Sequence, residues 1–417
     1  MSSSRTTLDS ALTAGRAVRF AAAASLFGTA LVVFVACADD SDPASPSSTE
    51  DGGTVIPTSD ASPVSDADDG VDDAGADAHA DAGRRICSDD GFCHSVVPKG
   101  QDLHGVWGDE DGIVWAISLQ NDVLRWDGTS WTVHHHSDVS LAAIWGSGRT
   151  DVWIVTASGL LHGEGATSAS LVFAPVPDLP GASTLPLKSI WGTGPNDIWV
   201  VGGVEPPMTP AGRVLHYGSD GEGGARWTSD DTSPAGVGFR AVWGSATSGV
   251  WVHGLEDVSG RTRARLLRRV PGAATWATID LPEDPAGGPV PFAGEIAAAA
   301  LSSDTTVWLS GKTSAARSAL WRGTSTDGAS FAWEFVTPAP YDRVINAFWG
   351  TGMNDTWAVG EWGLVARFDG STLEQAAIRV TDNPIGKTIR AIWGRNKDDF
   401  WVVGDEVALH KTSAGKP

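Results

Sequence analysis

A short tryptophan motif repeats along most of the chain, and its spacing limits the folds that the chain can adopt. A Trp-Gly pair is followed, eight residues after its Trp, by a second Trp, in six copies that begin at Trp107, Trp145, Trp191, Trp243, Trp349 and Trp393. A seventh copy keeps only its second Trp, at Trp308, with Ala300 in the place of the first. Counting Ala300, successive copies begin 38, 46, 52, 57, 49 and 44 residues apart.

Repeats of this length are typical of four-stranded propeller blades. Helical solenoids would show apolar residues with a period of 3.6, and that pattern is missing. The first copy predicts an inner strand at 103–107, a second at 113–118, a third at 123–126 and an outer strand at 131–135. An Asp-Gly pair marks a tight hairpin between the third and outer strands. We therefore predict an all-β fold, a seven-bladed β-propeller of four-stranded blades.

The two ends of the repeat region predict how the ring closes. The last copy supplies strands at 389–393, 400–403 and 407–410 and then lacks an outer strand. Residues 92–97 precede the first copy in the position of an outer strand. If this N-terminal strand pairs into the seventh blade, the ring keeps no open sheet edge.

The N-terminal residues 1–37 have the pattern of an export signal. Arginines precede an apolar run at 20–36 that is short for a membrane span. The small residues before Cys37 resemble the lipobox of bacterial lipoproteins, which implies that Cys37 is acylated, and Ala38 after it implies sorting to the outer membrane. Because Phe34 replaces the usual Leu, an uncleaved signal anchor and ordinary cleavage remain alternatives. The side of the membrane that the protein faces stays open.

Residues 38–85 form an acidic segment of low complexity. The formal net charge of the chain is -22. Thirteen of its acidic side chains lie in residues 38–83, where there is no Lys or Arg. Such a stretch cannot bury enough apolar surface to offset its ordering entropy, so we expect a disordered tether before a propeller at 86–417. The Asp run lacks the spacing of calcium-binding loops. The acidity also argues against nucleic acid as a partner.

Cys87 and Cys93 are the only cysteines besides Cys37. With Cys37 lipidated, an oxidising compartment leaves these two as a pair. We predict a disulfide that braces the ring closure, because a metal site would need more ligands than this segment offers.

The motif WGxxxxDxWxVG, best seen at 349–360, resembles the tryptophan-rich WG/DVWAVG repeat propellers of exported bacterial lipoproteins and, more distantly, BNR or Asp-box propellers. The resemblance covers residues 87–412 and implies the propeller fold. Turns such as those at 126–131, 219–227 and 325–333 resemble Asp-box turns, which in that family are structural and face away from the active site.

One position of the repeat supplies candidate ligand-binding residues at the mouth of the axial channel. It lies three residues before the first Trp of each copy and is occupied by His104, Ala142, Lys188, Arg240, Ala297, Asn346 and Arg390. In a closed ring the polar members converge, and the three basic ones can bind a carboxylate or a sulfate. The alternative is that they are solvated strand ends.

A second candidate region comes from unequal connections. Those between second and third strands are short in most copies but long at 202–212, 253–264 and 310–319, which predicts a raised sector of binding loops in copies three to five. Arg261, Arg263 and Arg265 lie there and favour an acidic polysaccharide or lipid head groups. Alternatively, they belong to a solvated strand with cross-strand partners.

Trp362 falls outside the repeat positions, in a tight connection on the rim. An exposed indole there would stack on a sugar or anchor a protein partner. The alternative is a side chain folded over its neighbouring blade.

Two functional classes remain. A sialidase-like enzyme needs an arginine cluster and a Tyr nucleophile activated by Glu. Only Tyr341 with Arg343, Arg240 and Arg390 approaches this set, and no Glu partner is evident. The run of three histidines at 134–136 places only two on one strand face, so we expect no metal.

We therefore expect a non-catalytic, monomeric, cell-envelope lipoprotein without a cofactor that binds a glycan or an envelope protein. A glycosidase or lyase, and an adhesin or assembly factor, are the alternatives.

Overall fold

The computed structural model describes residues 87–283, 285, 293–336, 343–380 and 383–412. The chain divides into two compact units, Met1–Asp73 and Ala74–Pro417, and every described residue lies in the second. The predictions for the export signal, for Cys37, for the tether and for Tyr341 fall outside the described residues.

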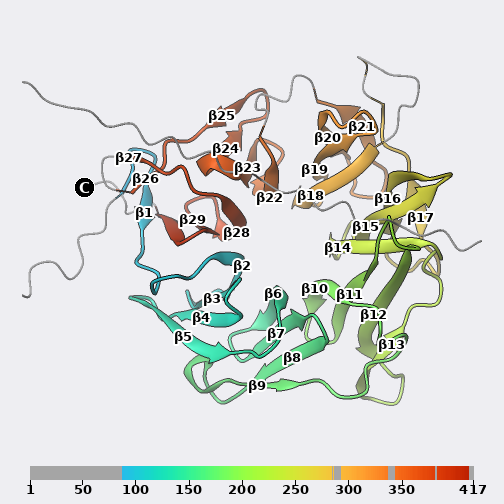
Figure 1. Ribbon diagram of the computed structural model, residues 1–417, viewed down its shortest axis with the longest axis horizontal. Helices are drawn as coiled ribbons and strands as arrows, with labels where there is room; N and C mark the ends of the chain where they lie inside the picture. Colours follow the sequence, from blue (N-terminus) through green and yellow to red (C-terminus); the bar gives the residue numbers. More distant parts are fainter. Residues whose placement is uncertain (1–86, 284, 286–292, 337–342, 381–382, 413–417) are drawn as a thin grey trace, which may run out of the picture. The chain divides into compact units, whose positions relative to one another are not determined.

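The described residues form seven four-stranded antiparallel sheets, which are the blades of a ring (Figure 1). The predicted fold class is confirmed. Blade one contains β2 (Leu103–Gly108), β3 (Val114–Ser118), β4 (Asp122–Trp126) and β5 (Trp131–His136). Blade two contains β6 (Leu141–Gly148), β7 (Asp151–Thr156), β8 (Gly159–Glu164) and β9 (Val172–Pro175). Blade three contains β10 (Leu187–Gly194), β11 (Asp197–Val204), β12 (Ala211–Ser219) and β13 (Ala225–Ser229).

The next three blades repeat this order. Blade four contains β14 (Val237–Ser245), β15 (Gly249–Val258), β16 (Arg261–Arg269) and β17 (Ala277–Ile279). Blade five contains β18 (Ala293–Ser303), β19 (Thr306–Thr313), β20 (Ser318–Thr324) and β21 (Ala332–Phe335). Blade six contains β22 (Ile345–Gly352), β23 (Asp355–Gly360), β24 (Leu364–Phe368) and β25 (Leu373–Gln375). The smaller elements are η1 (Ser168–Ser170), η2 (Glu361–Gly363), β26 (Arg379–Val380) and β27 (Asn383–Pro384).

Blade seven closes the ring as the sequence predicts. Its strands are β28 (Ile389–Asn396), β29 (Asp399–Gly404), β30 (Val407–Thr412) and, as the outer strand, β1 (Phe92–His94). β1 pairs antiparallel with β30, with Phe92 opposite Lys411. The predicted disulfide joins Cys87 to Cys93 directly beside this pairing. At the closure β28 lies beside β2, the inner strand of blade one (Figure 1).

The eroded copy forms a complete blade. Ala300 on β18 pairs with Trp308 on β19, in the register in which Trp349 pairs with Trp357 in blade six. The second Trp of this copy, Trp308, is 2% exposed. Loss of the first Trp therefore changes the packing between blades without changing the pairing within the blade.

The Trp-Gly pair joins neighbouring blades. A Cβ on Gly108 would come within 2.5 Å of the Trp393 ring, and one on Gly146 would come within 2.6 Å of the Trp107 ring. In each pair the Trp belongs to the preceding blade, so its large ring fills the wedge between two sheets. Glycine is required because a side chain at this position would occupy the space of that ring.

The prediction of a long binding loop in copy four was wrong. Residues 253–264 are a continuous hairpin rather than a long loop, because β15 and β16 extend to a two-residue turn at Ser259 and Gly260. Both turn residues have positive φ values, 57° and 79°, as a tight hairpin turn requires. In copies three and five the connections, 205–210 and 314–317, are also shorter than the predicted 202–212 and 310–319.

Candidate functional site

The predicted channel-mouth residues share one backbone feature. In every blade the pairing of the inner with the second strand shifts register at this position, for example between Leu103 and Gly105 and between Phe239 and Ala241. The shifted position is occupied by His104, Ala142, Lys188, Arg240, Ala297, Asn346 and Arg390. A β-bulge leaves its extra residue outside the ladder and re-aims the side chain. The sequence position is therefore structurally equivalent around the ring.

Two of these bulge residues bind the next blade. His104 Nε2 lies 3.0 Å from the carbonyl oxygen of Leu141, and Asn346 Nδ2 donates to the carbonyl oxygen of Ile389 at 2.8 Å. Both acceptors lie immediately before the bulge residue of the following blade. Burial comes first among the causes that lower the pKa of His104. These two side chains have an inter-blade structural role in addition to any contact with a ligand.

The basic bulge residues of blades three and four belong to a chain of ion pairs. Glu205, directly after β11, pairs with the Lys188 ammonium and accepts a 2.8 Å hydrogen bond from Arg240 Nε. Arg240 also pairs with Glu295 on β18. Burial alone would raise the pKa of Glu205, but the hydrogen bonds from Arg240 and Lys188 hold it below its usual range. The network ties blades three, four and five together.

Arg390 in blade seven is also paired. Its Nε donates to Asp405 Oδ1 at 2.6 Å, and Asp405 follows β29 as Glu205 follows β11. All three basic side chains predicted to bind an anion therefore have carboxylate partners from their own chain. An anionic ligand would have to compete with those partners.

His253 lies next to this network and was not recognised in the sequence. It is 1% exposed on β15, and its Nδ1 has no hydrogen-bond partner among the described residues. Burial, followed by the positive charge of Arg240, lowers the pKa of His253 to about 3. The imidazole is therefore neutral at physiological pH.

The arginines of the predicted sector lie on β16. Arg263 Nε donates to Glu256 Oε1 at 2.6 Å, and Arg265 approaches the same carboxylate at 3.7 Å. Arg261 is exposed beside the turn. The geometry thus matches the alternative interpretation for Arg263 and Arg265, a strand with cross-strand partners.

Trp362 lies on the same face of the ring as Glu205 and Asp405, because all three follow a second strand. We call this the mouth face, made of these connections and the bulge residues. The Trp362 side chain is 69% exposed. Its backbone is left-handed, with φ 55° and ψ 39°. The predicted exposure of this indole is therefore seen, rather than packing over a blade.

Hydrogen bonds hold the Trp362 turn in place. Gly363 N donates to the Lys387 carbonyl at 2.8 Å, and Glu361 N donates to the Val344 carbonyl at 3.1 Å. Arg343 Nη1 donates a longer bond of 3.4 Å to the Trp362 carbonyl. The indole is thus presented on a backbone that is anchored to the strand entrances of blades six and seven.

A pocket of about 180 Å³ continues from this turn towards blade five. Its apolar lining includes Ala297, Leu320 and Val344, and Lys312 and Arg343 lie among its polar residues. Arg343 and Val344 belong both to the pocket lining and to the contacts of the Trp362 turn. An indole, an apolar depression and two cationic side chains therefore lie next to one another.

The described part of the chain contains no arginine cluster of the kind that the catalytic alternative requires. Arg240 and Arg390 are separately paired with carboxylates, as described above, and Tyr341 lies outside the described residues. His134 Nε2 lies 2.9 Å from the Leu171 carbonyl, and His136 Nδ1 lies 2.7 Å from Asp122. Within the described ranges, no group of three or more His, Cys, Asp or Glu is arranged to hold a metal.

The turn between the third and outer strands of blade one is held by Asp127. The Asp of the turn after a third strand binds its own backbone: Asp127 Oδ1 accepts from Thr129 N at 2.8 Å and from Ser130 N at 2.9 Å. The Ser130 bond is the first of the causes that lower the pKa of Asp127 to about 2.

Among the residues with described structure, no helix has the length and apolar character of a membrane span.

Solved structures show which proteins share this fold. No protein-family model and no curated protein matches the sequence. YCF48 from Cyanidioschyzon merolae is similar with a TM-score of 0.55 and 14% identity, over 77% of this chain and 99% of that chain. YCF48 bound to D1 peptide gives 0.54 and 15%, over 79% and 99%.

The extracellular domain of the putative one component system BT4673 from B. thetaiotaomicron gives a TM-score of 0.54 and 16% identity. That match covers 77% of this chain and 39% of the other. At such identities the likeness shows a shared propeller fold and says nothing about activity.

Proposed function

We propose that the protein is a non-catalytic recognition module of the cell envelope, which binds a partner protein through the mouth face around Trp362. The observation that carries this proposal is the 69% exposure of an indole held on an anchored turn. Trp and Arg are the residues that most often dominate protein interfaces, and an adjacent apolar pocket can accept an anchoring side chain.

Protein is favoured over an anionic glycan by the state of the charges. Lys188, Arg240 and Arg390 are each paired internally, so they offer little free positive charge to a polysaccharide. Lys312 and Arg343 instead flank an apolar depression. A propeller that binds a peptide is represented among the similar structures by YCF48 with D1 peptide, which supports the plausibility of such a partner.

The location belongs to the same proposal. The lipobox-like segment would attach Cys37 to a membrane, and residues 38–85 would serve as the tether. A flexible chain of this length spans on average about 40 Å. The propeller would then act at a distance from the membrane surface, as a monomer that recruits or positions an envelope protein.

A selection experiment tests the proposed function. The full chain, purified in mild detergent and immobilised, is presented with a phage-displayed library of random peptides and, separately, with a glycan array. We expect enriched peptides with an apolar residue beside acidic ones, and no enrichment on the Trp362→Ala variant. Saturable binding to glycans alone would replace the protein partner with a sugar, because an exposed indole also stacks on sugar rings.

The non-catalytic part has its own test. The full chain is incubated with a panel of chromogenic glycosides and with polyuronate substrates for lyase activity. The proposal predicts no turnover above that of a heat-inactivated sample. Turnover that is lost in Arg343→Ala would establish the enzyme alternative.

A further inference from the structure

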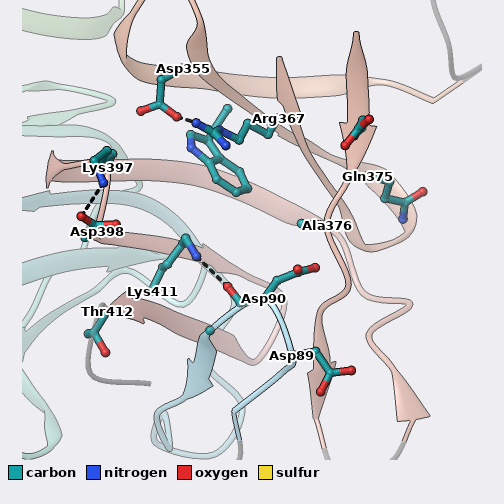
Figure 2. Close-up of a pocket in the computed structure, with 13 residues that line it drawn as sticks. Asp89, Asp90, Asp355, Arg367, Gln375, Ala376, Lys397, Asp398, Lys411 and Thr412 are labelled. Carbon is teal, nitrogen blue, oxygen red and sulfur yellow. Dashed lines mark hydrogen bonds and ion pairs between the residues drawn. The ribbon is translucent and has the colours of Figure 1, made fainter. Parts of the chain in front are cut away.

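A second cavity, of about 510 Å³, lies at the seam where the ring closes, away from the Trp362 turn. Its walls come from blade six, from the turn between β28 and β29, from the end of β30 and from the loop inside the disulfide. Figure 2 shows Arg367 and Asp355 on one side of the opening, with Lys411 and Asp90 facing them and Asp398 beside them. The volume lies in the range of small-molecule sites.

Behind one wall of this seam pocket lies a buried indole N–H without a hydrogen-bond partner among the described residues. In blades two and three the indole N–H of the second Trp donates to the Asp two residues earlier, as Trp153 donates to Asp151 at 2.8 Å. In blade six Asp355 instead accepts from Arg367 Nε at 2.8 Å and from Thr351 Oγ1 at 2.6 Å. Trp357 Nε1 is left buried without a partner among the described residues, as are Trp115 Nε1 and Trp308 Nε1 at the same position of blades one and five. Trp357 also lines the pocket.

Two cations lie beside the same indole. Lys411 Nζ is 5.8 Å from the Trp357 ring and donates to the Asp90 carbonyl at 2.6 Å. No carboxylate lies within ion-pair distance of Lys411 among the described residues. The Arg367 guanidinium lies 5.9 Å from the Trp357 ring and uses its Nε for Asp355. This wall therefore offers N–H groups and positive charge to an oxyanion.

The rest of the lining is acidic. The pocket has five acidic and three basic side chains, so its formal charge is negative. Asp89 on the disulfide loop is exposed, and within the described residues the only ion partner of Asp398 is the exposed Lys397. A simple anion would be repelled by these carboxylates, whereas a ligand with a separate ammonium group would be attracted by them.

We propose that the seam pocket binds a small zwitterion, an amino acid or a short peptide with free termini. Its carboxylate lies against Lys411 and Arg367, and its ammonium group lies towards Asp398. The site depends on ring closure, because the disulfide loop and the end of β30 meet on one side of it, opposite blade six. It is independent of the mouth face and of the proposed function.

Calorimetric titration of the full chain with alanyl-alanine tests the proposal. Two matched probes remove one charge each: alanyl-alanine amide lacks the carboxylate, and N-acetyl-alanyl-alanine lacks the ammonium group. We expect saturable binding of alanyl-alanine with a Kd of about 1 mM or below, and binding at least about tenfold weaker for both analogues. Equal binding of all three probes, or no saturation by alanyl-alanine at about 20 mM, would overturn the proposal.

Variants assign the contacts. Lys411→Met should weaken alanyl-alanine binding about tenfold, which corresponds to the loss of one charge-assisted hydrogen bond. Asp398→Asn, on the turn between β28 and β29, provides a second variant in case Lys411→Met disturbs the pairing of β30 with β1. Lys312→Met, the same replacement on the mouth face, serves as the control. Unchanged affinity in both pocket variants would contradict the assigned site, and Trp362→Ala should leave this binding unaltered.

Discussion

The indole N–H of Trp153 donates a 2.8 Å hydrogen bond to Asp151, which lies two residues earlier on β7. His162 stacks on the same indole at 3.7 Å and places its Nε2 2.6 Å from the Asp151 carboxylate. Blade three repeats the arrangement with Asp197, Trp199 and His216. In blades two and three the Asp of the repeat motif is thus explained by the buried indole that it satisfies.

Asp151→Ala should destabilise the protein by about 2 kcal/mol, because it leaves the Trp153 N–H without an acceptor and removes the partner of His162. Urea unfolding followed by tryptophan fluorescence measures the change. Asp138→Ala, at an exposed position, is the matched control and should stay within about 0.5 kcal/mol of the parent. Equal stability of the two variants would show that the Asp contributes nothing through these bonds.

The pH dependence of the free energy of unfolding should reflect the protonation of His253. Burial lowers the pKa of His253 from 6.5 to about 3. Between these two pH values the imidazole binds a proton in the unfolded chain but not in the folded chain. The stabilisation is complete above pH 6.5 and is lost as the pH falls towards 3. We predict that the free energy of unfolding falls by up to about 1.4 kcal/mol per pH unit below pH 6.

His253→Leu supplies the comparison for this slope. The replacement removes the titrating group and the unpartnered Nδ1, and it should flatten the dependence between pH 6 and pH 4.5. Urea unfolding at several pH values gives the slopes directly. If the parent and the variant lose stability in parallel, another group is responsible for the dependence. Carboxylates such as Asp197, whose pKa the His216 hydrogen bond lowers, act only below about pH 4.

Glu205→Gln tests whether the mouth cations are internally satisfied. The substitution leaves Lys188 and Arg240 without their shared carboxylate, so we expect a loss of about 2 kcal/mol for these half-buried groups. The variant should also gain a thermal stabilisation by sulfate that the parent lacks. Thermal unfolding in sulfate and in chloride at equal ionic strength measures this gain. A similar sulfate response in the parent would show that the mouth already binds anions.

The fold could be predicted because its determinants are local and periodic. Each Trp-Gly pair fixes an inner strand and its wedge, and the second Trp fixes the register, so even Ala300 could be aligned. The outer strand at Phe92 followed from the missing strand after Val407. The hairpin of copy four was missed because Ser259 and Gly260 form a tight turn without an Asn-Gly or Asp-Gly signal.

The state of the candidate site was less predictable. Lys188, Arg240 and Arg390 were found by their position in the repeat, but their partners Glu205 and Asp405 follow second strands, where the motif has no fixed residue. Trp362 could be recognised because it falls outside the repeat.

The seam pocket had no sequence signal. Asp89 and Lys411 come from opposite ends of the described chain and meet only on ring closure. Such pairings depend on three-dimensional closure and leave no periodic pattern in the sequence.

The affinity of a selected peptide for the parent and for Trp362→Ala is the most direct test of recognition at the mouth face. Met208→Ala is the matched control, because Met208 is also exposed, at 61%, on a connection between second and third strands. We predict at least a tenfold loss, about 1.4 kcal/mol, for Trp362→Ala and no loss for Met208→Ala. Unchanged affinity in Trp362→Ala, or a loss confined to Met208→Ala, would contradict the account and place recognition elsewhere on the ring.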